Sequence, residues 1–320
     1  MESESSRSLT TADGRPIEPL DPAIRTIQPG GGTCMRIELA WGFIRRAYLK
    51  LFRRGYLRRM EACRQGDTNP CPHDCLDPRD VKFYRNQGGY HWDLSDDPFT
   101  WRDRIPFARV GFAEMIIFSL LFVGAAIGLW FVHPLLSIVP ALLELEIIWF
   151  FRDPKRVTPS EPGLVVSPAD GKIDVIEYLD HDDVIGGPAV KIAIFLSVFN
   201  VHINRFPVDA QVFKISHRKG KFKSATSPEC ALINEQLELF LESTDDARRV
   251  MRLRQITGAI ARRIVCWVAP GDSLKRGQQL GMIKLGSRTE LVIPQEQGLE
   301  ILVELGDKVQ AGETLFARYA

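Results

Sequence analysis

The sequence predicts an α+β protein that is mainly β, in which a sandwiched-barrel domain follows a hydrophobic helical membrane hairpin and an N-terminal helical extension. Two observations favour this fold class. Residues 110–132 form an almost unbroken apolar run that is long enough for a membrane-spanning helix. Beyond Pro154 the chain changes to short β-branched runs separated by Gly, Pro and Asp, which is typical of strands and turns.

Composition bounds the class of protein. The 320 residues are 45% hydrophobic and carry a formal net charge of +1, so a sizeable core is expected and nucleic acid is not expected as a partner. Residues 1–10 lack the basic start and apolar run of a secretory signal, which predicts a cytosolic start. The six cysteines are therefore expected to be free thiols rather than a disulfide framework.

We predict that residues 1–33 form a flexible leader, because they contain Ser, Thr, Pro and a glycine run without a periodic apolar face. An N-terminal extension, 34–109, follows. Between Trp41 and Met60, apolar residues recur on one side of a helix and basic residues fill the other. This basic amphipathic helix fits two roles equally well: it could lie on an anionic membrane surface or pack on the protein's own body.

The same extension holds a group of potential metal ligands, Cys63, Cys71, His73 and Cys75. Thiolates and an imidazole can bind zinc tetrahedrally, but this spacing does not match a common zinc finger. The ligand-spacing rule therefore favours a Pro-rich turn with free thiols, and we predict no metal site.

The apolar run 110–132 is interrupted only by Glu114, and as a helix it would extend about 35 Å. His133-Pro134 ends it, and a shorter apolar stretch, 135–151, follows. We expect a spanning or re-entrant helical hairpin over 110–151; the alternative is a helical pair buried in a soluble core. Basic residues flank the pair and none lies between, so the positive-inside rule predicts a cell (inner) membrane protein with its C-terminal domain on the cytoplasmic face.

The C-terminal domain, 152–320, contains an internal repeat. Residues 271–280 and 306–315 each place glycines where tight turns need a positive φ, and an apolar residue where a short strand turns inward. This pattern resembles the barrel-sandwich hybrid fold of lipoyl and biotinyl carriers. Such carriers need an exposed lysine between the two turns, whereas this chain has Lys284-Leu285-Gly286-Ser287-Arg288 there.

Gly286-Ser287 carries the most chemical information. A serine hydroxyl can attack the sterically open carbonyl of a preceding glycine, when a strained backbone holds the two close, and replace the peptide by an ester. Elimination and hydrolysis then leave a pyruvoyl group, and the chain separates into 1–286 and 287–320. Gly-Ser by itself is usually a turn, so this chemistry depends on the surrounding motifs.

Four motifs, one of them around this dipeptide, occur in order along the chain: Phe150-Phe151-Arg152-Asp153-Pro154, Ser167-Pro168-Ala169-Asp170-Gly171-Lys172, Phe199-Asn200-Val201-His202-Ile203-Asn204-Arg205 and Ile283-Lys284-Leu285-Gly286-Ser287-Arg288. Together they resemble the phosphatidylserine decarboxylase family, most closely its short bacterial and archaeal branch. The resemblance covers about residues 110–320. It implies a pyruvoyl-dependent carboxy-lyase, made as a zymogen and cleaved autocatalytically between Gly286 and Ser287.

The resemblance also implies site residues. Asp170, His202 and Ser287 match the family's Asp-His-Ser constellation, in which His202 takes the proton of Ser287 as general base and Asp170 orients the imidazole. After cleavage His202 is freed to act on substrate. Better-known bacterial members have a second histidine nearby, and Arg205 stands at that position here. Without the resemblance, Asp170 would be interpreted as a turn residue and His202 as a core histidine.

The implied function is decarboxylation of phosphatidylserine to phosphatidylethanolamine, by Schiff-base chemistry between the substrate's amine and a covalent pyruvoyl (pyruvate) cofactor derived from Ser287. The expected partner is thus a membrane phospholipid. The cleaved large and small subunits are expected to stay associated, and assembly as a homo-oligomer is left open. Two alternatives remain: a non-catalytic, membrane-anchored barrel that acts as an adaptor or scaffold, and a decarboxylase of a related serine-headgroup ether lipid.

Overall fold

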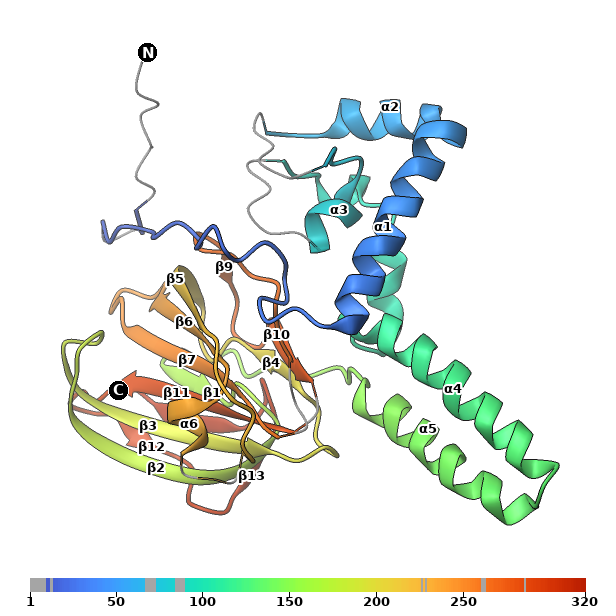
Figure 1. Cartoon of the computed structure of the whole chain (residues 1–320). Coiled ribbons are helices and arrows are strands. Elements are labelled where there is room, and N and C mark those ends of the chain that lie inside the picture. The colour runs from blue at the N-terminus through green and yellow to red at the C-terminus, as the bar shows by residue number, and fades with distance from the viewer. Residues whose placement is uncertain are drawn as a thin grey trace. The chain divides into compact units, whose positions relative to one another are not determined.

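The computed structural model of the chain describes residues 10–11, 14–66, 73–83, 90–225, 227, 229–259, 263–284 and 286–320. The chain divides into two compact units, one made of Met1–Asp21 and Arg156–Ala320 and the other of Pro22–Lys155. The first unit is built mainly of strands and the second of helices (Figure 1). The prediction of a mainly β protein with additional helices is therefore confirmed.

The described strands of the first unit are β1 (Leu164–Val166), β2 (Gly171–Asp182), β3 (Gly187–Leu196), β4 (Ile203–Arg205), β5 (Ala210–Arg218), β6 (Gln236–Ser243), β7 (Val250–Thr257), β8 (Arg263–Cys266), β9 (Ser273–Leu274), β10 (Gln279–Lys284), β11 (Ser287–Pro294), β12 (Glu300–Ile301), β13 (Lys308–Val309) and β14 (Leu315–Arg318), with one short helix, α6 (Cys230–Ile233). They form an eight-stranded sheet of order β13-β2-β3-β11-β7-β6-β5-β9 and two three-stranded sheets, β1-β14-β12 and β4-β10-β8. Every pairing among them is antiparallel.

Strand β11 lies inside the largest sheet, between β3 and β7, and all eight of its residues are buried. Its side chains alternate between the two faces of the sheet, as the two-residue period of a strand requires. Leu291 belongs to the main apolar core, so Ser287 and Thr289 lie on this core face as well. Arg288 and Glu290 lie on the opposite face. The serine of the Gly-Ser pair therefore begins a central, buried strand and faces the core.

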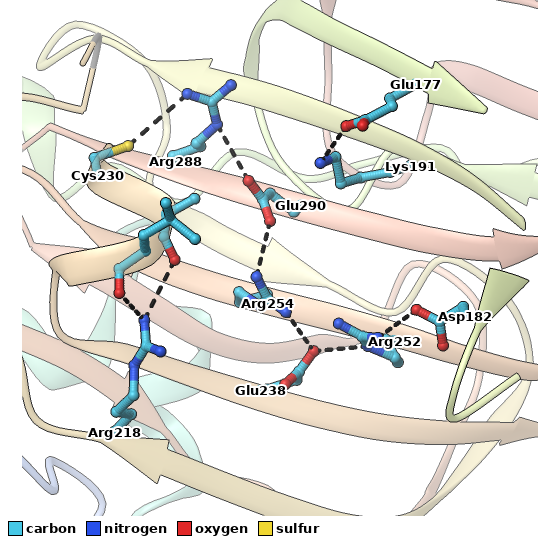
Figure 2. Close-up of polar contacts among 12 residues, drawn as sticks. Glu177, Asp182, Lys191, Arg218, Cys230, Glu238, Arg252, Arg254, Arg288 and Glu290 are labelled. Atoms are coloured by element: carbon cyan, nitrogen blue, oxygen red, sulfur yellow. Dashed lines mark hydrogen bonds and ion pairs between the residues drawn. The ribbon is translucent and has the colours of Figure 1, made fainter. Parts of the chain in front are cut away.

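The opposite face of the same sheet carries a ladder of alternating charges (Figure 2). Glu290 is 4% exposed and has a guanidinium on each side, Arg254 at 3.3 Å and Arg288 at 3.4 Å. Opposite charges on neighbouring strands stabilise a sheet, and a buried carboxylate needs such partners. The ladder runs in the order Arg288, Glu290, Arg254, Glu238, Arg252 and Asp182.

The two copies of the internal repeat adopt the same backbone. The φ angles of Gly271 and Gly306 are 96° and 99°, and those of Gly277 and Gly312 are 80° and 77°. Only glycine enters this left-handed region without strain, which confirms the predicted turns. The copies also touch, because a Cβ built on Gly312 would lie 3.3 Å from the Cα atom of Gly277. The repeat thus brings two equivalent turns together inside the β unit.

The described part of the predicted leader contacts strand β5. The backbone N–H of Glu18 donates to the carbonyl of Phe213 at 2.8 Å. Arg15 pairs with Glu242 at 2.9 Å, and its guanidinium lies 5.0 Å from the centre of the Phe213 ring. Residues 1–9 and 12–13 of the leader lie outside the described residues.

The described helices of the second unit are α1 (Thr33–Phe52), α2 (Arg54–Cys63), α3 (Pro78–Phe83), α4 (Phe112–Trp130) and α5 (Ile138–Phe150), with 3-10 turns η1 (Leu94–Asp96), η2 (Thr100–Arg104), η3 (Arg109–Gly111) and η4 (Pro134–Ser137). The basic amphipathic segment is helical but divided into α1 and α2. At Arg53 the backbone has φ −126° and ψ 40°, outside the helical region. Gly55, two residues after the break, is a local signal for it, because glycine is unfavourable inside a helix.

Helices α4 and α5 lie side by side, joined by η4 (Figure 1). The Ser119 hydroxyl donates to the Glu144 carboxylate at 2.6 Å and links them. Among the described helices, Arg109–Trp130 is the one long and apolar enough to cross a membrane, with 22 residues and a mean hydropathy of 2.2. Helix α5 has 13 residues, fewer than the roughly 20 that a crossing needs. Large apolar side chains stay exposed on both helices, such as Leu120 at 75%, and this surface suits lipid.

Candidate active site

The predicted site residues come from three segments of the β unit. Ser287 begins β11 directly after Gly286, His202 directly precedes β4, and Asp170 ends the connection from β1 to β2. The structure brings the histidine to the predicted cleavage point, because the backbone N–H of Gly286 donates to Nε2 of His202 at 3.1 Å. His202 and Ser287 are fully buried and Asp170 is 7% exposed, so all three are shielded from bulk water.

Both ring nitrogens of His202 have a partner of fixed character. Nδ1 lies 2.9 Å from the carbonyl oxygen of Asn200, which can only accept, so Nδ1 carries the proton. Nε2 faces the Gly286 N–H, which can only donate, so Nε2 presents its lone pair. Asn200 is itself held in place, since its side-chain oxygen accepts from the backbone N–H and hydroxyl of Ser197 at 2.9 and 2.7 Å. The result is a neutral imidazole with its basic nitrogen against Gly286, the residue before Ser287.

The hydroxyl of Ser287 is buried, and no described residue forms a hydrogen bond with it. Burying a hydroxyl without a partner costs about 1–3 kcal/mol, so such an atom calls for an explanation. The backbone around it is held on both sides, because Ser287 pairs with Leu196 of β3 and with Thr257 of β7. A fixed backbone with an unengaged hydroxyl suits a nucleophile that acts once, on the bond next to it.

Two glycines shape the cleavage point. Gly286 has φ +66°, a left-handed conformation in which other residues are strained. Gly258 packs against it: a Cβ built on Gly258 would lie 2.6 Å from the carbonyl oxygen of Gly286 and 3.2 Å from its carbonyl carbon. Since real Cβ atoms do not approach an oxygen so closely, only glycine at 258 lets the Gly286 carbonyl take this position.

Described residues hold Asp170 through a bidentate arginine and a backbone N–H. Nη2 of Arg156 donates to both of its carboxylate oxygens, at 2.9 and 2.8 Å, and the backbone N–H of Ala311 donates to Oδ1 at 2.8 Å. The other end of the guanidinium reaches Glu313 at 3.0 Å. The backbone N–H of Val157 and the Arg156 guanidinium hold the pKa of Glu313 below its ordinary value, although burial opposes them. Arg156 therefore bridges two carboxylates and fixes the Asp170 side chain.

Asn204 joins the segments that carry the predicted site residues. Its fully buried amide donates to the carbonyl of Pro168 at 3.3 Å and to the hydroxyl of Thr289 at 3.1 Å, and accepts from Gln255 at 2.8 Å. The backbone N–H of Arg205 also donates to the carbonyl of Pro168, at 2.9 Å. Strand β4, the loop before β2 and strand β11 are thereby tied to one another.

The residues beside the predicted site have structural contacts. Arg205, which stands where a second histidine was expected, is buried and donates to the carbonyl of Gly277 at 2.9 Å. Arg288 contacts Asp174 at 3.0 Å. It also lies 3.8 Å from the sulfur of Cys230 (Figure 2). Burial raises the pKa values of Asp174 and Cys230, and the charge of Arg288 partly offsets this. The Cys230 thiol therefore stays protonated at neutral pH and is a poor nucleophile.

Sequence reasoning missed three residues that position this site: Gly258, Arg156 and Asn200, whose carbonyl accepts from His202. The sequence did contain a signal for Gly258, because an isolated glycine at a strand often marks a place where another backbone segment approaches closely. Asn200 lies inside a quoted motif, but a backbone contact has no side-chain signature. Arg156 resembled an ordinary flanking charge, and its partners are 14 and 157 residues away.

No group of three or more His, Cys, Asp or Glu side chains that could hold a metal ion occurs in the part of the chain that the structure describes. Cys71 of the cysteine-histidine segment lies outside that part. Cys63 and Cys75 are reduced thiols.

Comparison with known proteins bears directly on this arrangement. A family model described as phosphatidylserine decarboxylase matches residues 143–317, a range that contains Asp170, His202 and Ser287. The chain is 52% identical over 241 residues to the phosphatidylserine decarboxylase proenzyme of Rhodopirellula baltica, which covers 75% of this chain and 99% of that relative. Proteins of the same name from Syntrophus aciditrophicus (40% identity, 69% of this chain, 98% of the relative) and Desulfotalea psychrophila (44%, 57% and 89%) are also similar.

Proposed function

The chain belongs to the phosphatidylserine decarboxylase family, and on this basis we propose how its own residues prepare it to act. It is a carboxy-lyase, made as a proenzyme, that converts phosphatidylserine to phosphatidylethanolamine and carbon dioxide. Nothing in the comparisons favours the adaptor or scaffold function. The finer points below concern which residues cut the chain and how they do so.

One observation carries the proposal: a buried serine hydroxyl without a described partner follows a glycine whose own N–H is hydrogen-bonded to the lone pair of a neutral imidazole. We assign Ser287 as the nucleophile and His202 as the general base. In the uncut chain Nε2 accepts from the Gly286 N–H, so His202 must give up that hydrogen bond before it takes the serine proton. The leaving group is the nitrogen of Ser287, and His202 can then deliver the serine proton to it.

The steps balance without an outside reagent other than water. The Ser287 oxygen bonds to the carbonyl carbon of Gly286, the peptide C–N bond breaks, and the proton from the hydroxyl reaches the released nitrogen. Loss of the α-proton of residue 287 then expels the Gly286 carboxylate. Water replaces the nitrogen, which leaves as ammonia, and a pyruvoyl group remains at residue 287.

We propose that Asp170 acts as the acidic member of this constellation. Its carboxylate is fixed by Arg156 and the Ala311 N–H, in a loop that β4 and Asn204 tie to strand β11. The negative charge of this carboxylate would stabilise the imidazolium that forms when the base takes a proton. Its role is therefore electrostatic, while the Asn200 carbonyl orients the ring.

The residues fit a covalent pyruvoyl cofactor, because the orphaned Ser287 hydroxyl supplies the atoms from which it is made. When formed, this group supplies an electrophilic ketone for the primary amine of the serine headgroup and accepts the electron pair released as carbon dioxide leaves. The surrounding chain excludes water, since β11 is buried along its whole length. We assign His202 as the proton carrier for the new end of the chain.

We further propose that the two cleaved parts, 1–286 and 287–320, remain associated. The small part contributes β11, hydrogen-bonded between β3 and β7 of the large part, so separation would break the middle of the largest sheet. We also propose a barrel-sandwich hybrid arrangement for 152–320, after a leader 1–33, an extension 34–109 and a hairpin 110–151. The exposed apolar hairpin supports membrane association, and the flanking basic residues support a cytoplasmic position for the catalytic domain.

The intact mass of the purified chain tests the cleavage. We expect wild type to give two polypeptides, 1–286 and 287–320, the second one starting with a ketone that reacts with an aminooxy reagent. Ser287→Ala should give one chain. His202→Gln should slow processing by roughly 100-fold or more, since general-base assistance contributes about that much. His181→Gln, at a histidine 61% exposed, is the matched control and should process normally.

A wild-type chain that stays uncut when membranes are supplied would contradict the assignment. A Ser287→Ala chain that is cut normally would move the nucleophile to another residue. If His181→Gln slows processing as much as His202→Gln, histidine loss acts through general destabilisation and His202 is not the base.

A further inference from the structure

A cavity of about 540 Å³ lies within the helical unit, lined by residues of α1, α3, η2, η3 and α4. Most of its lining is apolar, including Trp41 and Trp101, whose side chains are about half exposed. Three arginines, Arg79, Arg102 and Arg109, also line it. A mostly apolar cavity with a few charged groups at one place is the usual form of a site for an amphiphilic ligand.

The arginines gather closer than their charges favour. The guanidinium carbons of Arg79 and Arg102 lie 6.0 and 5.0 Å from the centre of the same ring, that of Phe99, and Arg102 also lies 5.3 Å from the ring of Trp101. Like charges held in one place repel, and aromatic faces offset only part of that cost. Arg79 of α3 and Arg102 of η2 nevertheless line one cavity.

Three carboxylates of the same unit pair with cations outside the cavity lining, while Asp97 and Asp77 act on Arg102 and Arg79 through their charges. Asp77 pairs with Arg45, Asp80 with Arg46 at 3.2 Å, and Asp74 with Lys50. Glu38 is the one acidic residue among the described lining residues, against three arginines. The cavity therefore has an excess of positive charge, which an added anion would balance.

The electrostatics agree with this charge excess. Burial, and then the charges of Arg79, Arg109 and Arg45, lower the pKa of Arg102 to about 10. Burial and the charge of Arg45 also lower the pKa of Arg79. Both side chains stay charged at neutral pH, but their charged forms are disfavoured as the unit stands. An anion among them would reverse this.

The cavity continues onto a lipid-facing surface. Ile116 of α4 belongs to its lining and is 61% exposed, on the helix whose length and hydropathy suit a membrane crossing. Tryptophans beside the start of such a helix are typical of the membrane interface, where rings lie at the level of the lipid headgroups. An anion with an attached acyl chain matches both the positive charges and the apolar part of the lining.

We propose that this cavity binds an anionic phospholipid, with the phosphate among Arg79, Arg102 and Arg109 and an acyl chain along the apolar face that includes Ile116. The planar guanidinium suits phosphate oxygens because it donates two parallel hydrogen bonds. The site uses none of the residues assigned to cleavage. It would hold a resident lipid beside the hairpin and favour anionic bilayers over neutral ones.

Quenching of tryptophan fluorescence tests this site in the full chain, solubilised in a neutral detergent. The probes are brominated phosphatidylglycerol, which is anionic but has no amine to react with the enzyme, and brominated phosphatidylcholine, which is neutral overall. We expect phosphatidylglycerol to bind at least about fivefold more tightly, and Arg102→Gln to remove about that factor. Replacing Trp101 with Phe should remove part of the extra quenching without weakening the affinity.

Arg58→Gln, at an exposed arginine of α2, changes the net charge equally and is the matched control. It should leave the preference intact, and Arg79→Gln should reduce it as Arg102→Gln does. The unfolding midpoint of Arg102→Gln without lipid should not fall, because the change relieves repulsion; this separates lost binding from lost folding. The measurement needs no turnover, so its result does not depend on the decarboxylase assignment.

Three outcomes would overturn the proposal. Equal affinity for the two lipids would show that the cavity does not select anions. Equal loss of preference in Arg58→Gln and Arg102→Gln would mean a diffuse charge effect. Displacement of phosphatidylglycerol by millimolar inorganic phosphate, at constant ionic strength, would indicate a site for a soluble anion instead of a lipid.

Discussion

Three polar atoms around Gly286 and Ser287 determine the chemistry of the bond between them. The Asn200 carbonyl forces the His202 proton onto Nδ1, the Gly286 N–H occupies Nε2, and the Ser287 hydroxyl is left without a described partner. The uncut chain thus stores one unsatisfied buried group beside one base. Cleavage removes that hydroxyl altogether, so the cost of burying it exists only in the proenzyme.

Gly258 offers the sharpest test at this scale. Gly258→Ala places a methyl group 2.6 Å from the Gly286 carbonyl oxygen, so the carbonyl has to shift away from Ser287. We expect self-cleavage to slow by roughly 10- to 100-fold, the usual effect of displacing a reacting group by part of an ångström or more. The rate at which the 287–320 fragment appears, followed by mass spectrometry, measures it.

Gly187→Ala is the control, because a Cβ there meets nothing within 4 Å. Its processing rate should equal that of wild type. Normal processing of Gly258→Ala would show that the Gly286 carbonyl is not held by this contact.

Among the elements, β11 combines two functions on its two faces. The core face begins with Ser287 and continues with Thr289, which Asn204 binds; the other face carries the Arg288–Glu290 part of the charged ladder (Figure 2). A one-residue slip of this strand would exchange the faces, burying charges in the apolar core. The ladder and the Asn204 network therefore fix the register that keeps Ser287 at the cleavage point.

Glu290→Gln should be costly for this reason. It leaves Arg254 and Arg288 without their shared carboxylate in a place that is 4% exposed, and we expect a loss of roughly 2–3 kcal/mol in the free energy of unfolding. Thermal unfolding of the detergent-solubilised chain measures it. Glu177→Gln breaks the more exposed pair with Lys191 and should cost less than about 1 kcal/mol. Similar losses in both variants would mean that the ladder adds no more than a surface pair.

The contact between Arg156 and Glu313 predicts a dependence on pH. The folded pKa of Glu313 is depressed, so its contribution to stability is present above its unfolded pKa, near 4.5, and is lost as the pH falls through the lower folded value. The difference in unfolding midpoint between wild type and Glu313→Gln should therefore be constant above about pH 5 and shrink at lower pH. A difference that grows on acidification would show that the pKa of Glu313 is raised in the folded chain.

On the scale of the whole molecule, the helical unit and the reactive strand differ in how much of their side chains they expose. The helical unit exposes large apolar side chains on α4 and α5, whereas β11 buries everything it carries. The net charge of +1 for the whole chain gives no indication of the three arginines at the cavity of the helical unit. A phospholipid substrate gives this division a purpose, since the enzyme has to stay at the bilayer in which its substrate lies.

Leu120→Arg tests the role of the hairpin. A charge near the middle of Arg109–Trp130 disfavours membrane insertion by roughly 2.5–3.5 kcal/mol, so the fraction of chain that resists extraction at alkaline pH should fall several-fold. Leu305→Arg, at an exposed leucine of the β unit, should leave that fraction unchanged. Full retention of Leu120→Arg in the membrane fraction would mean that other segments hold the protein there.

The sequence by itself determined the elements whose signals are local. The apolar run before His133 specified a membrane-length helix, the glycines near 271 and 306 specified two equal turns, and the ordered motifs around Gly286-Ser287 specified the family. Each signal depends on neighbouring residues, through the period of a helix, the φ of a turn or the chemistry of one peptide bond. Such signals can be interpreted without knowledge of the fold.

Only the tertiary structure decided which distant residues complete these elements. Gly258 lies against the Gly286 carbonyl because β7 and β11 are neighbours, and Arg156 reaches Glu313 across 157 positions. Likewise, Arg79 and Arg102 meet over the ring of Phe99 although nothing in their spacing suggests it. Contacts of this kind follow from strand order and helix packing, which minimise the free energy of the whole core and leave no mark on any single stretch of sequence.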